Sequence, residues 1–274
     1  MANRALRPPG VEPLRTTSWW QHAVTIARFT LLECARMRLL GTVALTVAAL
    51  VLASLLVEQV AIAESTRVRT VLFASSCRFA TVALLCQYII ASVVRELNDA
   101  GIQFVLTLPT PRSALYIGKL AAFCTMALLI ALVTGIAAMG AADAQRAAVW
   151  GALLCAELSL MAGVALFCAL GTRQSLSAML LCGSFYLVGR GIAGFERLMA
   201  THLESDLDAF TRLGSIAIQI LAAVLPDLSR FARAEWLADA SPGLADLTAA
   251  AAQTAIYLAL TASAGIHDLK RRIF

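Results

Sequence analysis

Charged residues are scarce in this sequence of 274 residues: they make up 14% of it, whereas soluble domains carry about 25%. Hydrophobic residues make up 60%, and the mean hydropathy is +0.79. This balance excludes a disordered chain, a nucleic-acid-binding arm and an ordinary soluble enzyme. Aromatic residues are also few, at 7%, so the apolar content is mainly aliphatic. The composition therefore indicates an integral membrane protein built from α-helices.

Patterns that form disulfides or bind metals are missing as well. The seven cysteines occur singly, mostly within apolar stretches, and the three histidines (His22, His202 and His267) form no cluster with them. Scattered cysteines of this kind are typical of small buried apolar side chains rather than of a disulfide framework or a zinc site. We therefore expect no metal site.

Six apolar segments are long enough to cross a membrane, whose core of about 30 Å requires roughly 20 residues per helix. They lie near 41–63, 71–94, 115–138, 148–171, 175–195 and 248–266. A further apolar segment, Gly214–Leu225, is too short, so we expect a re-entrant or interfacial helix inside the outer segment 196–247. The last span is mostly Ala and Thr, and we expect it to depend on packing through small side chains.

The N-terminal region divides into two parts. Residues 1–16 hold three Pro and three Arg without an apolar core, which predicts a flexible cytoplasmic tail rather than a signal peptide. Residues 17–40 form a basic amphipathic pattern. Its apolar face holds Trp20, Val24, Ala27 and Leu31. Such a helix is expected to lie in the cytoplasmic headgroup region before the first span.

The distribution of Lys and Arg predicts the orientation. With six spans and the N-terminus inside, thirteen basic residues lie on the cytoplasmic side and seven on the outer side. The segment 196–247 carries eight acidic residues, which also suits the outer side. The positive-inside rule therefore places both termini of this multi-pass protein in the cytoplasm.

Motifs for catalysis or nucleotide binding are absent or out of context. Gly189–Gly194 reads G-x-G-x-x-G, but it lies in a hydrophobic helix and follows no strand, so we expect close helix packing or a local turn there. Gly118-Lys119 lacks the other residues of a phosphate-binding loop. No histidine lies in a span, and both lysines, Lys119 and Lys270, lie at the membrane boundary. An intramembrane hydrolase is therefore disfavoured, and we expect no catalytic residue and no bound cofactor on this chain.

The connection between the second and third spans is the most informative stretch. Arg95-Glu96 closes the second span, Gly101 permits a turn, and Ile102–Leu108 is a short apolar helical segment that Pro109 ends. Such a segment outside the bilayer needs a cover. The cover is either a groove on another protein or the chain's own amphipathic helix.

These residues resemble a known loop. Arg95-Glu96, the glycine five residues later, Leu108-Pro109, and Arg112 or Ser113 before Gly118-Lys119 are similar to the coupling-helix loop of ABC type-2 transporter permeases. The amphipathic helix 17–40 resembles the elbow helix of that family. Two further stretches, Leu225–Phe231 and Asp268–Arg272, resemble its outer Pro-containing segment and its basic ending. The layout fits over nearly the whole chain, with departures at Ile102 and Pro111.

The resemblance implies an all-α permease of six transmembrane helices, with one membrane domain at 17–274. It implies a bacterial cytoplasmic (inner) membrane protein that exports an unidentified substrate. Its partners would be membrane lipids, a second permease half (the same or a related chain, forming a dimer) and two separate ABC ATPase subunits, which bind ATP and Mg²⁺. No nucleic acid is implied. The alternatives are a non-transporting membrane scaffold of an envelope assembly and, less favoured, an intramembrane enzyme.

The resemblance also implies which residues couple the permease to its ATPase. Leu97, Phe104, Val105 and Leu108 would contact the ATPase, while Glu96 and Arg112 would hold the ends of the loop. The full set is Arg95, Glu96, Leu97, Gly101, Phe104, Val105, Leu108, Pro109 and Arg112.

Three charges fall inside the predicted spans. Glu157 lies about 14 Å from the outer end of its span at 1.5 Å per residue, Arg78 about 10 Å and Arg190 about 7 Å. An unpaired charge near the bilayer centre costs about 2.5–3.5 kcal/mol. We therefore predict that Glu157 pairs with Arg78 or Arg190 between helices. The cluster is then either a structural clamp or part of the outer translocation path.

Overall fold

The computed structural model describes residues 19–60, 65–98, 111–202, 225–239 and 242–271. Every regular element in these ranges is a helix. They are α1 (Trp19–Arg36), α2 (Leu39–Val60), α3 (Ser65–Asn98), α5 (Arg112–Ala138), α6 (Ala144–Thr172), α7 (Ser175–His202), the 3₁₀ helix η1 (Leu228–Arg230), α9 (Ala234–Ala238) and α10 (Leu244–Arg271). The expected all-α class is confirmed for this part of the chain.

Five of these helices are long and apolar enough to cross a membrane. They are α2, α3, α5, α6 and α10. Four of the six predicted spans lie entirely within them, and the span 41–63 lies in α2 as far as Val60, so the prediction of several apolar helices of membrane-spanning length is confirmed. The sixth predicted span, 175–195, lies within α7, which is 28 residues long but is not among the five.

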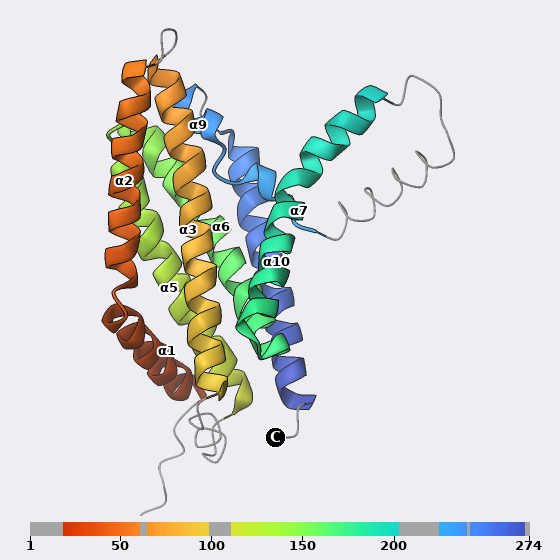
Figure 1. Ribbon diagram of the computed structural model, residues 1–274. Coiled ribbons are helices and arrows are strands. Elements are labelled where there is room, and N and C mark those ends of the chain that lie inside the picture. The colour runs from red at the N-terminus through yellow and green to blue at the C-terminus, as the bar shows by residue number, and fades with distance from the viewer. Residues whose placement is uncertain (1–18, 61–64, 99–110, 203–224, 240–241, 272–274) are drawn as a thin grey trace, which may run out of the picture.

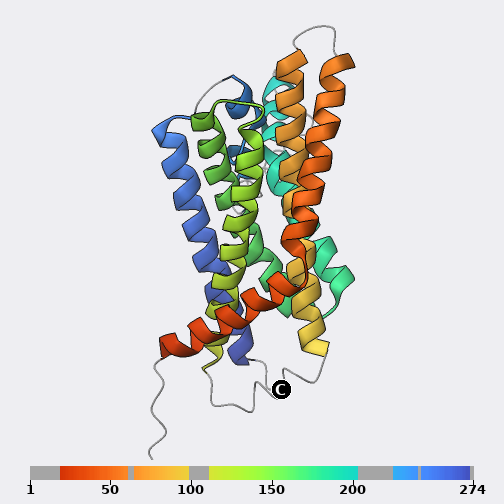
Figure 2. The same cartoon turned by 90° about the vertical axis from the view of Figure 1, so that its left-hand side faces the viewer.

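The membrane-length helices run side by side, and α1 crosses one end of their bundle (Figures 1 and 2). The ends of α3 and α10 and the start of α5 lie at this same end, which we call the α1 end. The other end holds η1 and α9, and the far part of α7 leans away from the bundle (Figure 1). If α7 also spans the membrane, the described helices cross it six times, an even number.

The amphipathic helix is shorter than the predicted segment 17–40. Helix α1 ends at Arg36, and Leu39 already belongs to α2. Between them Arg38 adopts the left-handed conformation, with φ 56°. This residue turns the chain sharply, because a left-handed residue breaks the regular helical path. Helix α1 thereby lies crosswise to α2 and packs against α5.

Helix α6 is the centre of the bundle. In its most apolar stretch 72% of the residues are buried, against 17% in α2 and in α10. It contacts α3, α5, α7 and α10, with Trp150, Leu154 and Leu158 fully buried. Glu157, which lies in this stretch and has no exposed surface, therefore faces other helices rather than lipid.

Helix α10 packs through small residues, in agreement with the prediction for the last span. A Cβ atom at Gly163 of α6 would lie 2.9 Å from Oγ1 of Thr261, and one at Gly265 would overlap the ring of Tyr116. The Tyr116 hydroxyl also donates to the carbonyl of Thr261, at 3.0 Å. Close approach of this kind stabilises helix pairs in membranes through packing and hydrogen bonds, since the surrounding lipid provides no hydrophobic driving force.

Candidate functional site: a buried charge cluster beneath the outer segment

Three helices bring charged side chains together near the end opposite α1. Arg78 from α3, Glu157 from α6 and Arg190 from α7 form what we call the outer charge cluster, after the side on which the sequence is expected to place this end. Glu157 has no exposed surface, and Arg78 is buried. Oε1 of Glu157 lies 3.8 Å from Nη1 of Arg190. The predicted pairing of Glu157 with one of the two arginines is thus present, and the partner is Arg190.

A tyrosine completes the surroundings of the carboxylate. The hydroxyl of Tyr186, one turn before Arg190 on α7, donates to Oε1 of Glu157 at 3.3 Å. Within the described residues, Oε2 of Glu157 and Nε of Arg78 are buried and have no hydrogen-bond partner. Two polar atoms of the cluster therefore lack hydrogen bonds in a buried place, where an unmade hydrogen bond costs free energy.

Backbone carbonyls of the outer segment bind the two arginines. From here on, the name outer segment means only Pro226–Ala238, a described part of 196–247 that includes η1 and α9. Nη1 of Arg190 donates to the carbonyl of Leu228 at 2.5 Å and is 3.4 Å from that of Phe231. Nη1 of Arg78 donates to the carbonyl of Ala232 at 2.9 Å. The stretch is largely irregular, so the backbone carbonyls of Phe231 and Ala232 are not used in a helix, whereas that of Leu228 also accepts from the backbone nitrogen of Phe231 at 3.3 Å.

Ala232 is the centre of this contact. Its carbonyl also accepts a hydrogen bond from the ring nitrogen of Trp150, at 3.1 Å. Ala232 is fully buried, and its φ of 37° lies in the left-handed region, which is unfavourable for any residue with a Cβ. The hydrogen bonds from Arg78 and Trp150 hold the backbone in that conformation.

The first glycine of the discarded nucleotide motif, Gly189, has a packing role instead. A Cβ atom at Gly189 would lie 3.1 Å from the carbonyl of Pro226 and 3.1 Å from Leu228. The glycine therefore lets the outer segment approach α7 closely. The expectation of close packing is thus met at Gly189, the first residue of the motif.

The start of η1 is held by Asp227. Its Oδ1 accepts from the backbone nitrogen of Ser229 at 3.0 Å and from the Ser229 hydroxyl at 2.6 Å, and its Oδ2 accepts from Nε of Arg230 at 2.8 Å. Burial acts to raise the pKa of this carboxyl, but the hydrogen bonds from Ser229 and Arg230 outweigh it and hold the pKa below its usual range. The charged form of Asp227 therefore stabilises the turn.

The sequence did not identify Trp150, Tyr186 or Ala232 as members of this site. Trp and Tyr carry a polar group that needs a partner when it is buried, so both rings within apolar spans were an available signal. No sequence signal marks the carbonyl of Ala232. The predicted re-entrant helix Gly214–Leu225 lies almost entirely outside the described residues.

The α1 end holds the ends of the predicted coupling loop. Nζ of Lys119, from α5, pairs with Oε2 of Glu96, from the end of α3, and the Lys119 side chain is 8% exposed. Glu33 of α1 accepts from Arg95 at 2.8 Å and from Ser92 at 3.2 Å. We call these two ion pairs the loop anchor. They tie α3 to both α5 and α1.

Two further predicted residues lie near the loop anchor. Nη1 of Arg112 donates to the carbonyl of Leu269 at 3.0 Å, so the start of α5 is tied to the end of α10. Leu97 is half-buried against the protein's own core, which leaves only part of it for a partner. The other predicted coupling residues lie outside the described residues. They are Gly101, Phe104, Val105, Leu108 and Pro109.

Within the described part of the chain, no group of three or more His, Cys, Asp and Glu residues is arranged to hold a metal ion. In comparisons with known proteins, neither a family model nor a curated protein matches this chain.

Proposed function

We propose that this chain is the permease subunit of an ATP-driven ABC exporter, and that a separate ATPase supplies the energy. In this proposal α7 is the sixth span, and a second permease half completes the transporter. The α1 end faces the cytoplasm of a bacterium, where the connection 99–110 meets the ATPase. The resemblance of residues 94–119 to a coupling loop is the starting point, and the geometry at both ends of that connection supports it.

The loop anchor is the observation that carries the proposal. Coupling requires that a displacement of the connection by the ATPase moves the attached helices. A flexible joint between the connection and the helices would prevent this. The Glu96–Lys119 pair joins the two helices that the connection links, and the Arg95–Glu33 pair adds α1. Because Lys119 is nearly buried, its ion pair is less screened by water than a surface pair. A push on the connection would therefore reach α3, α5 and α1 together.

Helix α1 fits the role of an elbow helix. It crosses the α1 end and packs so closely on α5 that a Cβ atom at Gly118 would lie 2.7 Å from the carbonyl of Ala23. The ring nitrogen of Trp19 also donates to the hydroxyl of Ser113, at 3.2 Å. Helix α1 is thus fastened to the start of α5, directly after the connection that would receive the ATPase.

A membrane scaffold without transport is the second candidate. The closed outer charge cluster favours it, since Glu157 has no exposed surface and the outer segment covers both arginines. A scaffold needs no ATPase, whereas a permease does. The two candidates therefore differ in one partner that can be isolated.

The test is co-purification with an ATPase. We expect the tagged chain, purified from its native membrane, to retain a phosphate-loop ATPase that is encoded in a neighbouring reading frame. Changing Phe104 and Leu108 together to Asp should release that ATPase, because a charge in a desolvated apolar contact costs several kcal/mol. The matched control is Leu244→Asp, an apolar residue that is 82% exposed at the start of α10, at the opposite end. This control should retain the ATPase. Isolation of the wild-type chain without any ATPase, or full transport by the double variant, would contradict the proposal.

A further inference from the structure

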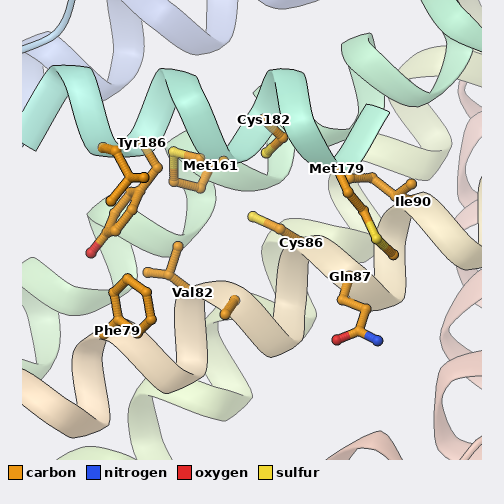
Figure 3. A pocket seen from close by; sticks show the side chains of 12 residues that line it. Phe79, Val82, Cys86, Gln87, Ile90, Met161, Met179, Cys182 and Tyr186 are labelled. Carbon is orange, nitrogen blue, oxygen red and sulfur yellow. The ribbon is translucent and has the colours of Figure 1, made fainter. Parts of the chain in front are cut away.

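An elongated cavity lies between α3, α6 and α7, separate from the loop anchor. Its volume is about 260 Å³. Figure 3 shows that it extends from Phe79 and Tyr186 at one end to Ile90 and Met179 at the other. Phe79 and Ile90 are eleven residues apart on α3, which corresponds to about 16 Å along the helix. The cavity is thus long, narrow and parallel to the membrane helices.

The walls of the cavity are apolar and adaptable. Met161 from α6 and Met179 from α7 contribute flexible thioethers, and Cys86 and Cys182 lie between them (Figure 3). Methionine side chains adjust to ligands of different shape because they are unbranched and polarisable. Among the described residues that line the cavity there is no Asp, Glu, Lys or Arg. It suits an uncharged hydrocarbon chain rather than an ion or a sugar.

The volume agrees with such a chain. A methylene group is close in size to a water molecule, which takes up ~30 Å³ in the liquid. The cavity therefore has room for roughly eight methylene groups. Phe79 and Leu187, on either side of it, are largely exposed, so the cavity opens sideways between α3 and α7 toward the surrounding membrane.

Gln87 is the polar residue that the cavity leaves unexplained. It lines the cavity, its side chain is exposed, and it makes no side-chain hydrogen bond to any residue that the structure describes. Helix α3 is about 51 Å long at 1.5 Å per residue, so a hydrocarbon core of about 30 Å centred on it leaves about 10 Å of helix beyond each side of the core. Gln87 lies eleven residues before the end of α3, hence about 6 Å inside the hydrocarbon at the α1 end. A primary amide there needs a partner, since lipid tails offer none.

We propose that this cavity binds an amphiphile that enters from the membrane, with its hydrocarbon chain between α3 and α7 and an uncharged amide or ester group hydrogen-bonded to Gln87. Gln87 lies only about 6 Å below the boundary between head groups and hydrocarbon chains in the leaflet at the α1 end, close to the depth of an amphiphile's first polar group. The chain then points toward Tyr186, whose hydroxyl contacts the outer charge cluster. This inference adds a ligand to the proposed function. It rests on that function only where it treats the bound amphiphile as the exported substrate.

The experiment uses the purified full chain in phosphatidylcholine vesicles and two photoreactive probes. One is a twelve-carbon N-alkyl amide with a diazirine on its chain, and the other is a hydrocarbon of the same length with the same diazirine. After illumination, mass spectrometry locates the adducts. For the wild-type chain we expect both probes to label the cavity residues of α3 and α7 more strongly than exposed lipid-facing residues such as Leu45 and Leu52.

A glycine in the wall supplies the blocking variant. Gly183 lines the cavity, and a Cβ atom there would meet nothing within 4 Å, so we expect the ring of Gly183→Phe to occupy the cavity without a clash at its Cβ atom. It should lower cavity labelling by both probes roughly tenfold. Gly41→Phe in α2 is the matched control, because a Cβ atom there also meets nothing within 4 Å and the residue lies outside the cavity. It should leave labelling unchanged. Should Gly183→Phe fail to fold, Ala83→Phe blocks the cavity from the opposite wall.

Gln87→Leu tests the hydrogen bond. Loss of one neutral hydrogen bond should lower labelling by the amide probe about three- to tenfold. Labelling by the hydrocarbon probe should not fall. Labelling that is spread evenly over lipid-facing residues, or that Gly183→Phe leaves intact, overturns the proposal. A third result would also overturn it: Gln87→Leu turns a dimer of the chain into a monomer and leaves the labelling unchanged. In that case the partner of Gln87 is a second copy of the chain. No ATPase takes part in this experiment, so its outcome is independent of whether an ATPase co-purifies.

Discussion

The carboxylate of Glu157 lies 3.8 Å from the guanidinium of Arg190, at a place where the carboxylate has no exposed surface. The pair joins α6, the most buried helix, to α7. Removing one partner of a buried ion pair leaves the other charge uncompensated, which costs far more than losing a surface pair.

Glu157→Gln should therefore destabilise the protein. The variant keeps the shape of the side chain but leaves Arg78 and Arg190 without a counter-charge, and we expect a loss of about 3 kcal/mol in the free energy of unfolding. Denaturant unfolding in detergent micelles measures it. Asp239→Asn is the matched control, because Asp239 pairs with Arg67 at 2.8 Å and both side chains are about half exposed, so water screens the charges. The control should lose about 1 kcal/mol or less. Unchanged stability of Glu157→Gln together with lost transport would favour the translocation path over the clamp.

Ala232 offers a test of the strained turn that the arginines hold. Its φ of 37° suits glycine, so Ala232→Gly should leave stability within about 1 kcal/mol of the wild type. Ala232→Val should destabilise by about 2 kcal/mol or more, because a β-branched side chain fits neither that backbone nor the fully buried position. Hydrogen exchange of the amides in 226–238 should quicken in the valine variant only. Equal exchange in both variants would show that the turn is not held as the geometry indicates.

The loop anchor can be tested by exchanging its charges. Glu96→Lys and Lys119→Glu should each place two like charges together, and each should lower both thermal stability and ATP-driven transport. The double variant restores an opposite pair and should recover most of both. A double-mutant cycle on the melting temperature measures the coupling between the two positions. Additive losses in the double variant would mean that the two side chains act independently.

The outer segment should loosen in acid. The folded pKa of Asp227 lies below its unfolded value of about 3.9, so the native state binds fewer protons between the two values. The stabilisation is fully present above the unfolded pKa and is lost as the pH falls through the folded one. Limited proteolysis within 226–238 should thus be constant from pH 7 to 5 and should increase below about pH 4. The variant Asp227→Asn should be cleaved faster at neutral pH and should lose this acid dependence. A wild-type profile identical to that of the variant would remove Asp227 from this role.

Much of the arrangement was predictable from local patterns. Long apolar runs predicted five helices that the structure confirms as long and apolar enough to span, and the small residues of 248–266 predicted close packing of α10. The amphipathic pattern predicted a helix before the first span, but its end was placed four residues too late. The amphipathic helix ends close to Arg38, where the backbone changes to the left-handed conformation. Hydropathy does not report backbone conformation. The presence of charges inside spans predicted an ion pair, because an unpaired charge in lipid is costly.

The partners of those charges depended on the tertiary structure. Hydropathy and charge are properties of single residues, so the sequence by itself determined which segments are apolar enough to span and which charges need a partner. It did not determine that Arg190 lies nearest Glu157 or that Arg78 is bound by the carbonyl of Ala232, 154 residues later in the chain. Backbone carbonyls are the same in every residue, and a distant side chain can donate to one only where folding places it within reach. The outer charge cluster and the cavity beside it are therefore products of how α3, α6, α7 and the outer segment pack together.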